Sequence, residues 1–306
     1  MMPYRMLLTA VALALGLAAL PAHAADAGQA NQSLARKFAS PDQTIEYHFM
    51  LKAPAFSDAG INETLAGVLD SLKLIGEAEK LKGPREGAYI DTRDRVLDKA
   101  HLIVRLRNGL FTVKARSTDL ASLTDLQPCT RTKYEQDFFD EVGYSISSEV
   151  VFKKEEWLED PTKASVKDVM AFLQAKCPAL GSQLEPILKP LQSLVAPGVA
   201  RMYSAEFKLN HPLAARLKEA NVAAWLFPGS PHTLVEVAWT GLVSDKAALD
   251  RMYYELRDKL ANAGLLAPDQ SSKTEQYFKA FFGATALDMN GDRMLYRWAQ
   301  AGIIGN

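Results

Sequence analysis

The stretch Tyr89–Arg116 has the sequence YIDTRDRVLDKAHLIVRLRNGLFTVKAR and contains two runs in which apolar and charged residues alternate. Because successive side chains of a β-strand point to opposite faces, residues 102–107 and 111–116 are each expected to form a strand with one apolar and one basic face. Asn108-Gly109 between them is typical of a tight hairpin turn. The basic faces carry Arg105, Arg107, Lys114 and Arg116. Two adjacent strands therefore present a patch suited to an oligophosphate.

The same periodicities predict further elements along the chain. Strands are expected at 44–52, 133–139, 150–153, 201–209, 223–227 and 233–239, the last two flanking a Pro-Gly-Ser-Pro turn. Amphipathic helices are expected at 61–81, 165–176, 245–263 and 272–282. Strands and helices do not alternate one for one, and the strands look antiparallel. The predicted fold class is α+β, a closed or nearly closed antiparallel β-barrel with helices packed on the outside.

The direction of the basic faces decides whether these cations are functional. In the simplest alternative they are solvated on the outside of the sheet, as charges on half-buried strands usually are. The amphipathic helices, however, need apolar strand faces to cover. Helices that coat the outside of a barrel leave the charged faces to line its interior. Glu46, Glu135 and Asp137 would then share that interior with the cations, which suits phosphate and a divalent metal.

The N-terminus has the three parts of a secretory signal peptide. Arg5 precedes an apolar run at 6–20, and Ala22-His23-Ala24 has the small-x-small pattern of a cleavage site. The run is short for a membrane span, although a retained anchor is the alternative. We expect a signal peptide at 1–24 and an exported protein, periplasmic or secreted. The mature chain is not expected to insert stably into a membrane.

The remaining length suits one large domain or two small ones. Residues 25–40 are polar and small, which predicts a flexible leader. We expect residues 41–283 to form the barrel domain and residues 284–306 a helical extension at the C-terminus. The 306-residue chain has a formal net charge of −1, which gives no indication of a nucleic-acid partner. The expected partner is instead a small polyanion.

Two cysteines, Cys129 and Cys177, are present. Export permits a disulfide between them. The long spacing and the lack of neighbouring ligand residues argue against a metal site. The sequence does not decide whether this disulfide forms, because the geometry that it requires does not follow from the spacing of the cysteines.

The pattern around the quoted stretch resembles the central part of a CYTH domain, found in the triphosphate tunnel metalloenzymes. The matching segments are Tyr89-x-Asp91-Thr-x-Asp94, Leu97-x-x-Ala100, Arg105-x-Arg107 and Lys114-x-Arg116. This superfamily includes thiamine triphosphatases, inorganic tripolyphosphatases, fungal-type RNA triphosphatases and class IV adenylate cyclases. The resemblance spans about 44–282. It implies an eight-stranded antiparallel tunnel in which basic side chains hold a triphosphate and acidic ones hold Mg²⁺ or Mn²⁺.

The resemblance also implies a role for each matching residue. Phosphate would be bound by Arg105, Arg107, Lys114, Arg116, Lys133, Arg201 and Lys273. The metal ion would be held by Glu46, Glu135, Asp137 and Glu236. Catalysis would depend on Lys114, Arg107 and Glu135.

The chain departs from the family pattern mainly at the positions that would hold the metal ion. The family begins with Glu-x-Glu-x-Lys, where this chain has Thr44-x-Glu46-x-His48, and Ala238 replaces the second acid of a later pair. One interpretation is a metal-dependent phosphohydrolase acting on a triphosphate or polyphosphate. Another is a degenerate tunnel that binds a polyanion or other ligand without turnover. The third is a different secreted barrel with its charges outside. Export argues against a cyclase or thiamine triphosphatase, which would need cytoplasmic nucleotide.

Overall fold

The computed structural model describes residues 32–53, 60–107, 109–138, 141–153, 163–191 and 193–282. The expected signal peptide and the expected C-terminal extension lie outside these residues. Within them, no helix has the length and apolar character needed to cross a membrane.

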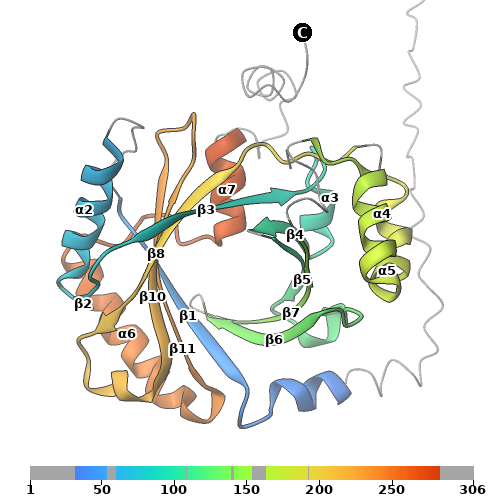
Figure 1. Cartoon of the computed structure of the whole chain (residues 1–306). Helices are drawn as coiled ribbons and strands as arrows, with labels where there is room; N and C mark the ends of the chain where they lie inside the picture. Colours follow the sequence, from blue (N-terminus) through green and yellow to red (C-terminus); the bar gives the residue numbers. More distant parts are fainter. Residues whose placement is uncertain are drawn as a thin grey trace, which may run out of the picture.

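Nine strands form one closed barrel (Figure 1). In order around the barrel they are β1 (Thr44–Leu51), β11 (Thr233–Leu242), β10 (Leu217–Leu226), β8 (Ala200–Glu206), β3 (Lys82–Ile90), β4 (Leu102–Arg107), β5 (Leu110–Ser117), β7 (Val142–Val151) and β6 (Arg131–Phe138). Neighbouring strands are antiparallel except β6 and β1, whose parallel pairing closes the barrel. The predicted closed barrel is confirmed. It has one parallel pair, and one strand more than the eight that the resemblance implies.

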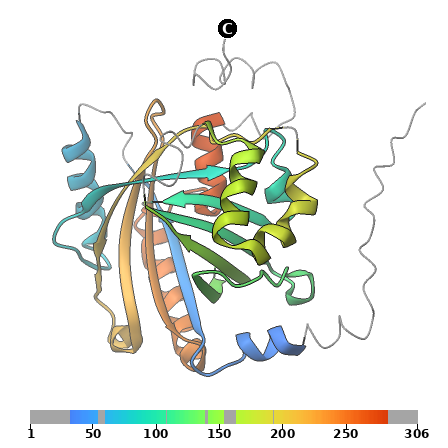
Figure 2. The same ribbon diagram turned by 45° about the vertical axis from the view of Figure 1, so that its right-hand side comes forward.

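Helices cover the outside of the barrel on two sides (Figure 2). On one side, α4 (Val166–Lys176) and α5 (Pro178–Leu188) share a core with the apolar faces of β4 and β5. On the other side, α2 (Ile61–Leu72) and α6 (Lys246–Asn262) pack with β1, β10 and β11. The apolar faces of β4 and β5 therefore point outward to helices, and their basic faces point into the barrel.

One end of the barrel is filled by α7 (Lys273–Phe282). Its Tyr277 and Phe278 share a third apolar cluster with Tyr89 and Trp225, which come from β3 and β10. The shorter elements are α3 (Val96–Lys99), the two-stranded sheet of β2 (Gly76–Glu77) and β9 (Lys208–Leu209), and 3₁₀ turns at Leu120–Ser122, Pro212–Arg216 and Val243–Asp245.

Part of the expected flexible leader is folded. Residues 32–38 are helical, and Leu34 and Phe38 are each only 2% exposed. These two residues are spaced i, i+4, so both reach the barrel from one helix face. The Phe38 ring lies 5.9 Å from that of Tyr134 and 5.2 Å from that of Tyr144. The leader prediction is therefore corrected for this part of 25–40.

Two further segments differ from the expected elements. The helix expected over 61–81 ends at Leu72, because Gly76 begins a strand that packs directly on the backbone of Lys208. The strand expected over 150–153 extends over Val142–Val151. It lacks apolar alternation because its inward face carries Ser145 and Ser147.

A disulfide joins Cys129 and Cys177, whose Cα atoms lie 5.7 Å apart. It connects the loop before β6 to the junction of α4 and α5. We expect the double substitution Cys129→Ser, Cys177→Ser to lower the free energy of unfolding by about 2–4 kcal/mol, because the bridge closes a long loop of the unfolded chain. Urea unfolding would measure this loss, and reduction of the unaltered protein should reproduce it. An unchanged midpoint would contradict the expectation.

Candidate functional site

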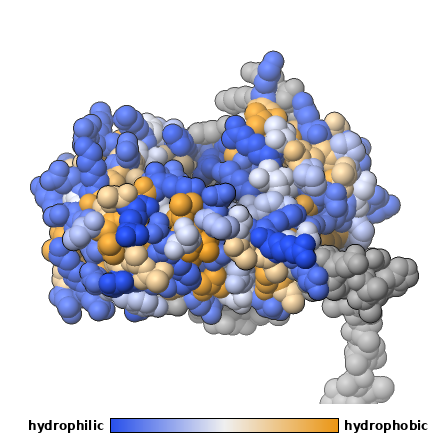
Figure 3. All heavy atoms as spheres, turned by 90° about the horizontal axis from the view of Figure 1, so that it is seen from below, coloured by the Kyte–Doolittle hydropathy of each residue, from blue (hydrophilic) through white to orange (hydrophobic). Residues whose placement is uncertain are grey.

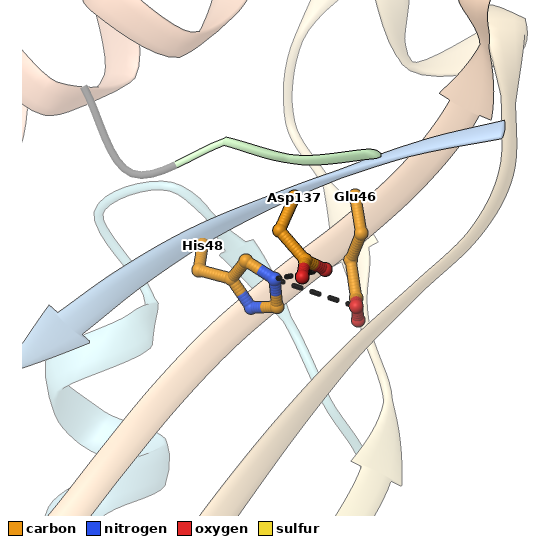
Figure 4. Close-up of side chains that lie close together, drawn as sticks. All are labelled: Glu46, His48 and Asp137. Atoms are coloured by element: carbon orange, nitrogen blue, oxygen red, sulfur yellow. Dashed lines mark ion pairs between the residues drawn. The ribbon is translucent and has the colours of Figure 1, made fainter. Parts of the chain in front are cut away.

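Side chains from β1, β6 and β11 meet inside the barrel around His48. Figure 4 shows those of Glu46, His48 and Asp137. Its Nδ1 lies 2.7 Å from Glu236 Oε1, and its Nε2 lies 3.3 Å from Glu46 Oε2 and 3.9 Å from Asp137 Oδ1. Strand pairing explains this convergence. Glu46 is opposite Asp137, and Glu236 is opposite Met50, which follows His48 on the same face of β1. One imidazole is therefore surrounded by three carboxylates.

The carboxylates hold His48 in its charged form. Burial alone would lower its pKa, yet the charge of Glu46 and the proximity of the Asp137 and Glu236 carboxylates raise that pKa to about 10. Burial likewise opposes the charge of Glu46, but His48 brings the pKa of Glu46 down to about 2. Near neutral pH this cluster is therefore an imidazolium paired with carboxylates.

Three further cations compensate the same carboxylates. Lys114 Nζ is 3.4 Å from both Glu135 Oε2 and Asp137 Oδ2. The other contacts are Arg116 Nη2 to Asp137 Oδ2 at 3.2 Å and Lys273 Nζ to Glu236 Oε2 at 3.0 Å. Despite burial, Lys114, Arg116 and His48 hold the pKa of Asp137 well below its usual range. This part of the barrel is thus balanced in charge by the protein's own side chains.

Arg105 and Arg107 on β4 differ from those cations, because neither forms an ion pair within the described part of the chain. Both side chains are partly buried. The charge of Arg105, together with burial and the charge of Arg85, lowers the pKa of Arg107. Arg85 belongs to β3 and was missed in the sequence because residues 82–87 show no alternation. Guanidinium groups crowded in this way favour the binding of an anion.

The structure does not bring Arg201 to this site. Arg201 is opposite Leu226 on β10, and it lies on the face of β8 that is opposite to Met202. Met202 packs inside the barrel with Trp225, whereas Tyr203 packs in the outer core. The expected position of Arg201 is therefore corrected. Strand periodicity places its side chain outside, together with that of its i+2 neighbour.

Asp91 of the quoted motif has a structural role. Its side chain is buried and accepts hydrogen bonds from the backbone N–H groups of Thr92, Leu97 and Asp98. These bonds fix the turn between β3 and β4, with α3 inside it. The motif thus sets the position from which β4 presents its arginines.

Other inward-facing polar residues were not among the expected site residues. They are Thr112 on β5 and Ser145, Ser147 and Glu149 on β7. All four are buried. A pattern that marks buried positions by apolar residues misses side chains of this kind.

The carboxylates of the cluster fit a divalent ion. Ligand atoms of Glu46, His48 and Asp137 lie within 4.8 Å of one another. Both carboxylate oxygens of Asp137 are buried and accept no hydrogen bond from the described residues, so they retain lone pairs for an ion. Carboxylate oxygens suit Mg²⁺ and Mn²⁺. A ligating histidine must be neutral, so Glu46, Asp137 and the adjacent Glu135 are better candidate ligands than His48.

Together, the closed barrel and its charged interior agree with the barrel that the CYTH resemblance implies, apart from the ninth strand and the parallel pair. No family model matches the sequence, and a search of curated proteins found no match. Among solved structures, a proposed adenylyl cyclase from Hippeastrum, described as having a dominant triphosphatase activity, matches with a TM-score of 0.43. It shares 14% identity over 75% of this chain and 93% of its own.

Two further solved structures are similar. A protein from Pyrococcus horikoshii matches with a TM-score of 0.36 and 12% identity, over 76% of this chain and 99% of its own. A proposed adenylate cyclase from Bacillus halodurans matches with a TM-score of 0.34 and 12% identity, over 76% and 98% respectively.

Proposed function

We propose that the barrel is a metal-dependent phosphohydrolase that takes a triphosphate or polyphosphate into its tunnel. The observation that carries the proposal is the pairing of two unlike surfaces on one inner wall. Arg105 and Arg107 on β4 offer guanidinium groups that have no ion-pair partner among the described residues. Across β5 and β7, the carboxylates of Glu135 and Asp137 on β6 fit a divalent ion.

Lys114 lies between the two surfaces. It is 3.4 Å from each of the two β6 carboxylates, and it stands two residues along β5 from Thr112, the partner of Arg105. Arg105 and Arg107 would bind phosphate oxygens and orient the chain, while Lys114 and Arg116 would stabilise charge at the reacting phosphoryl group. Phosphoryl transfer depends mainly on such positioning and charge stabilisation. A divalent ion on the carboxylates would polarise the phosphoryl group or activate water.

A second candidate is a tunnel that binds polyanions without turnover. It is favoured by the position of His48, a buried cation among the carboxylates. A divalent ion at Glu46 and Asp137 would be repelled by this imidazolium. The network is balanced without an ion, so anion binding at Arg105 and Arg107 would persist in metal-free protein.

For the location, we propose export to an oxidising compartment. The signal-like sequence at 1–24 supports it. The disulfide between Cys129 and Cys177 supports it independently, because disulfides persist mainly in such compartments. The face in Figure 3 is predominantly hydrophilic, with hydrophobic residues in small groups, as expected for a water-exposed surface.

The test is release of phosphate from tripolyphosphate and ATP by the chain from Ala25 onward, with and without Mg²⁺ or Mn²⁺. We expect metal-dependent release that Lys114→Ala abolishes. Lys167→Ala, which removes an exposed cation from α4, is the matched control and should retain it. If tripolyphosphate raises the melting temperature but no metal supports phosphate release, the second candidate, a tunnel that binds polyanions without turnover, is correct. If tripolyphosphate has no effect at all, both candidates are wrong.

A further inference from the structure

A row of polar side chains crosses the inner wall of the barrel beside the arginines. Arg105 on β4 is opposite Thr112 on β5, Thr112 is opposite Glu149 on β7, and Glu149 is opposite Arg131 on β6. Cross-strand partners share a face of the sheet, so these four side chains lie on the same inner face. The row lies apart from the cluster around His48, which is built on β1, β6 and β11.

Three polar atoms in this row have no hydrogen-bond partner among the described residues: Arg105 Nε, Thr112 Oγ1 and Glu149 Oε2. Thr112 is 1% exposed and Glu149 is 2% exposed. Among the described residues, the ion-pair contact of Glu149 is a long one, from Oε1 to Lys133 Nζ at 3.9 Å. Buried polar groups are rarely left without partners. A bound molecule would therefore supply the hydrogen-bond partners that these three atoms lack.

Glu149 limits which anion can complete the row. An ionised carboxylate only accepts hydrogen bonds. Sulfate and the internal phosphates of a chain also only accept, so they would face Glu149 with like charge. A terminal phosphate group has a second pKa of about 6 and carries a proton for part of the time near neutral pH. That proton can be donated to Glu149 while the other oxygens accept from Arg105 and Thr112.

We propose that Glu149 accepts a hydrogen bond from a monoprotonated terminal phosphate group bound by Arg105 and Thr112. It thereby selects phosphate over sulfate and chain ends over internal phosphates. This inference rests on the proposed anion-binding tunnel and narrows its ligand. The ligand is a molecule with a terminal phosphoryl group, such as a polyphosphate end, a nucleoside triphosphate or a phosphomonoester.

The test compares the affinities of inorganic phosphate and sulfate by titration calorimetry at about pH 6, where inorganic phosphate retains a proton to donate and sulfate has none. In the unaltered protein we expect phosphate to bind at least about tenfold more tightly, the equivalent of one hydrogen bond to a charged group. In Glu149→Gln the ratio should approach one, because an amide can donate to either anion. Glu149→Asp retains the acceptor and should retain the preference. Glu185→Gln on the outside of α5 is the matched control and should leave the ratio unchanged.

Equal affinities in the unaltered protein would overturn the inference without any variant. A phosphate preference that persists in Glu149→Gln would also overturn it. Tripolyphosphate binding separates this result from the underlying proposal. If tripolyphosphate binds but phosphate and sulfate are not distinguished, the inference fails while the tunnel function stands. If neither phosphate nor tripolyphosphate binds, both fail.

Discussion

Arg107→Gln is expected to weaken tripolyphosphate binding by about 10- to 100-fold without lowering the stability of the fold. A charge-assisted hydrogen bond contributes about 1.5–3 kcal/mol, which corresponds to this loss of affinity. Stability should not fall, because Arg107 has no ion pair among the described residues and its pKa is lowered by the charge of Arg105, by burial and by the charge of Arg85. The folded protein thus holds this guanidinium against repulsion. Removing its charge should leave the melting temperature equal or slightly higher.

Two measurements check the expected loss of affinity without a loss of stability. Calorimetric titration gives the change in affinity, and thermal unfolding without ligand gives the change in stability. Arg216→Gln is a suitable control, because Arg216 is exposed and paired with Asp245 on the outside of the barrel. It should leave ligand affinity unchanged. A large loss of melting temperature in Arg107→Gln, or unchanged affinity, would show that Arg107 is a structural residue.

His48→Gln is expected to lower the free energy of unfolding by about 3–5 kcal/mol, the usual effect of removing one partner from a buried ionic network. The amide keeps polar contacts but removes the positive charge between Glu46, Asp137 and Glu236. These three carboxylates, two of them buried, then share fewer cations and repel one another. The same change opens the site to a metal, so Mn²⁺ should stabilise the variant more than the unaltered protein.

The stability lost in His48→Gln should depend on pH in a defined way. The pKa of His48 rises from 6.5 to about 10 on folding, so its contribution is complete below pH 6.5 and is lost as the pH rises through 10. The pKa of Glu46 falls from 4.5 to about 2, so its contribution is present above pH 4.5 and is lost as the pH falls through 2. The variant should differ most from the unaltered protein between about pH 4.5 and 6.5.

Urea unfolding across this pH range, with and without Mn²⁺, measures both effects. Glu185→Gln is again a suitable control, since it alters a partly exposed carboxylate of α5 that is paired with Lys189 outside the barrel. Equal unfolding midpoints for the variant and the unaltered protein between pH 4.5 and 6.5 would contradict the ionic network. Greater stabilisation of the unaltered protein by Mn²⁺ would show that His48 does not oppose the metal.

The sequence predicted the barrel and its basic wall for a clear physical reason. β4 and β5 alternate strictly, and the helices α4 and α5 that cover their apolar faces are amphipathic. Because the apolar faces must pack against these helices, the charged faces point into the barrel. β7 shows no such contrast, because Ser145, Ser147 and Glu149 are buried although they are polar.

The charge network was out of reach of sequence patterns for a different reason. His48 looked like a replacement for a lysine, and its pairing with Asp137 and Glu236 depends on which strands become neighbours. Arg201 shows the converse. Its place in a strand was anticipated, but the face on which it lies depends on the packing of Met202 and Tyr203.

The closure of the barrel by β1 has a consequence for folding. Thr44 pairs with Leu242, so the first strand finds its partner near the far end of the described chain. Contacts between such distant segments form late, because closing a long loop costs entropy before any contact rewards it. The acidic cluster combines β1, β6 and β11, so it is assembled only when the barrel closes. A newly made chain is therefore expected to form the basic faces of the neighbouring β4 and β5 first, and to bring the carboxylates around His48 together last.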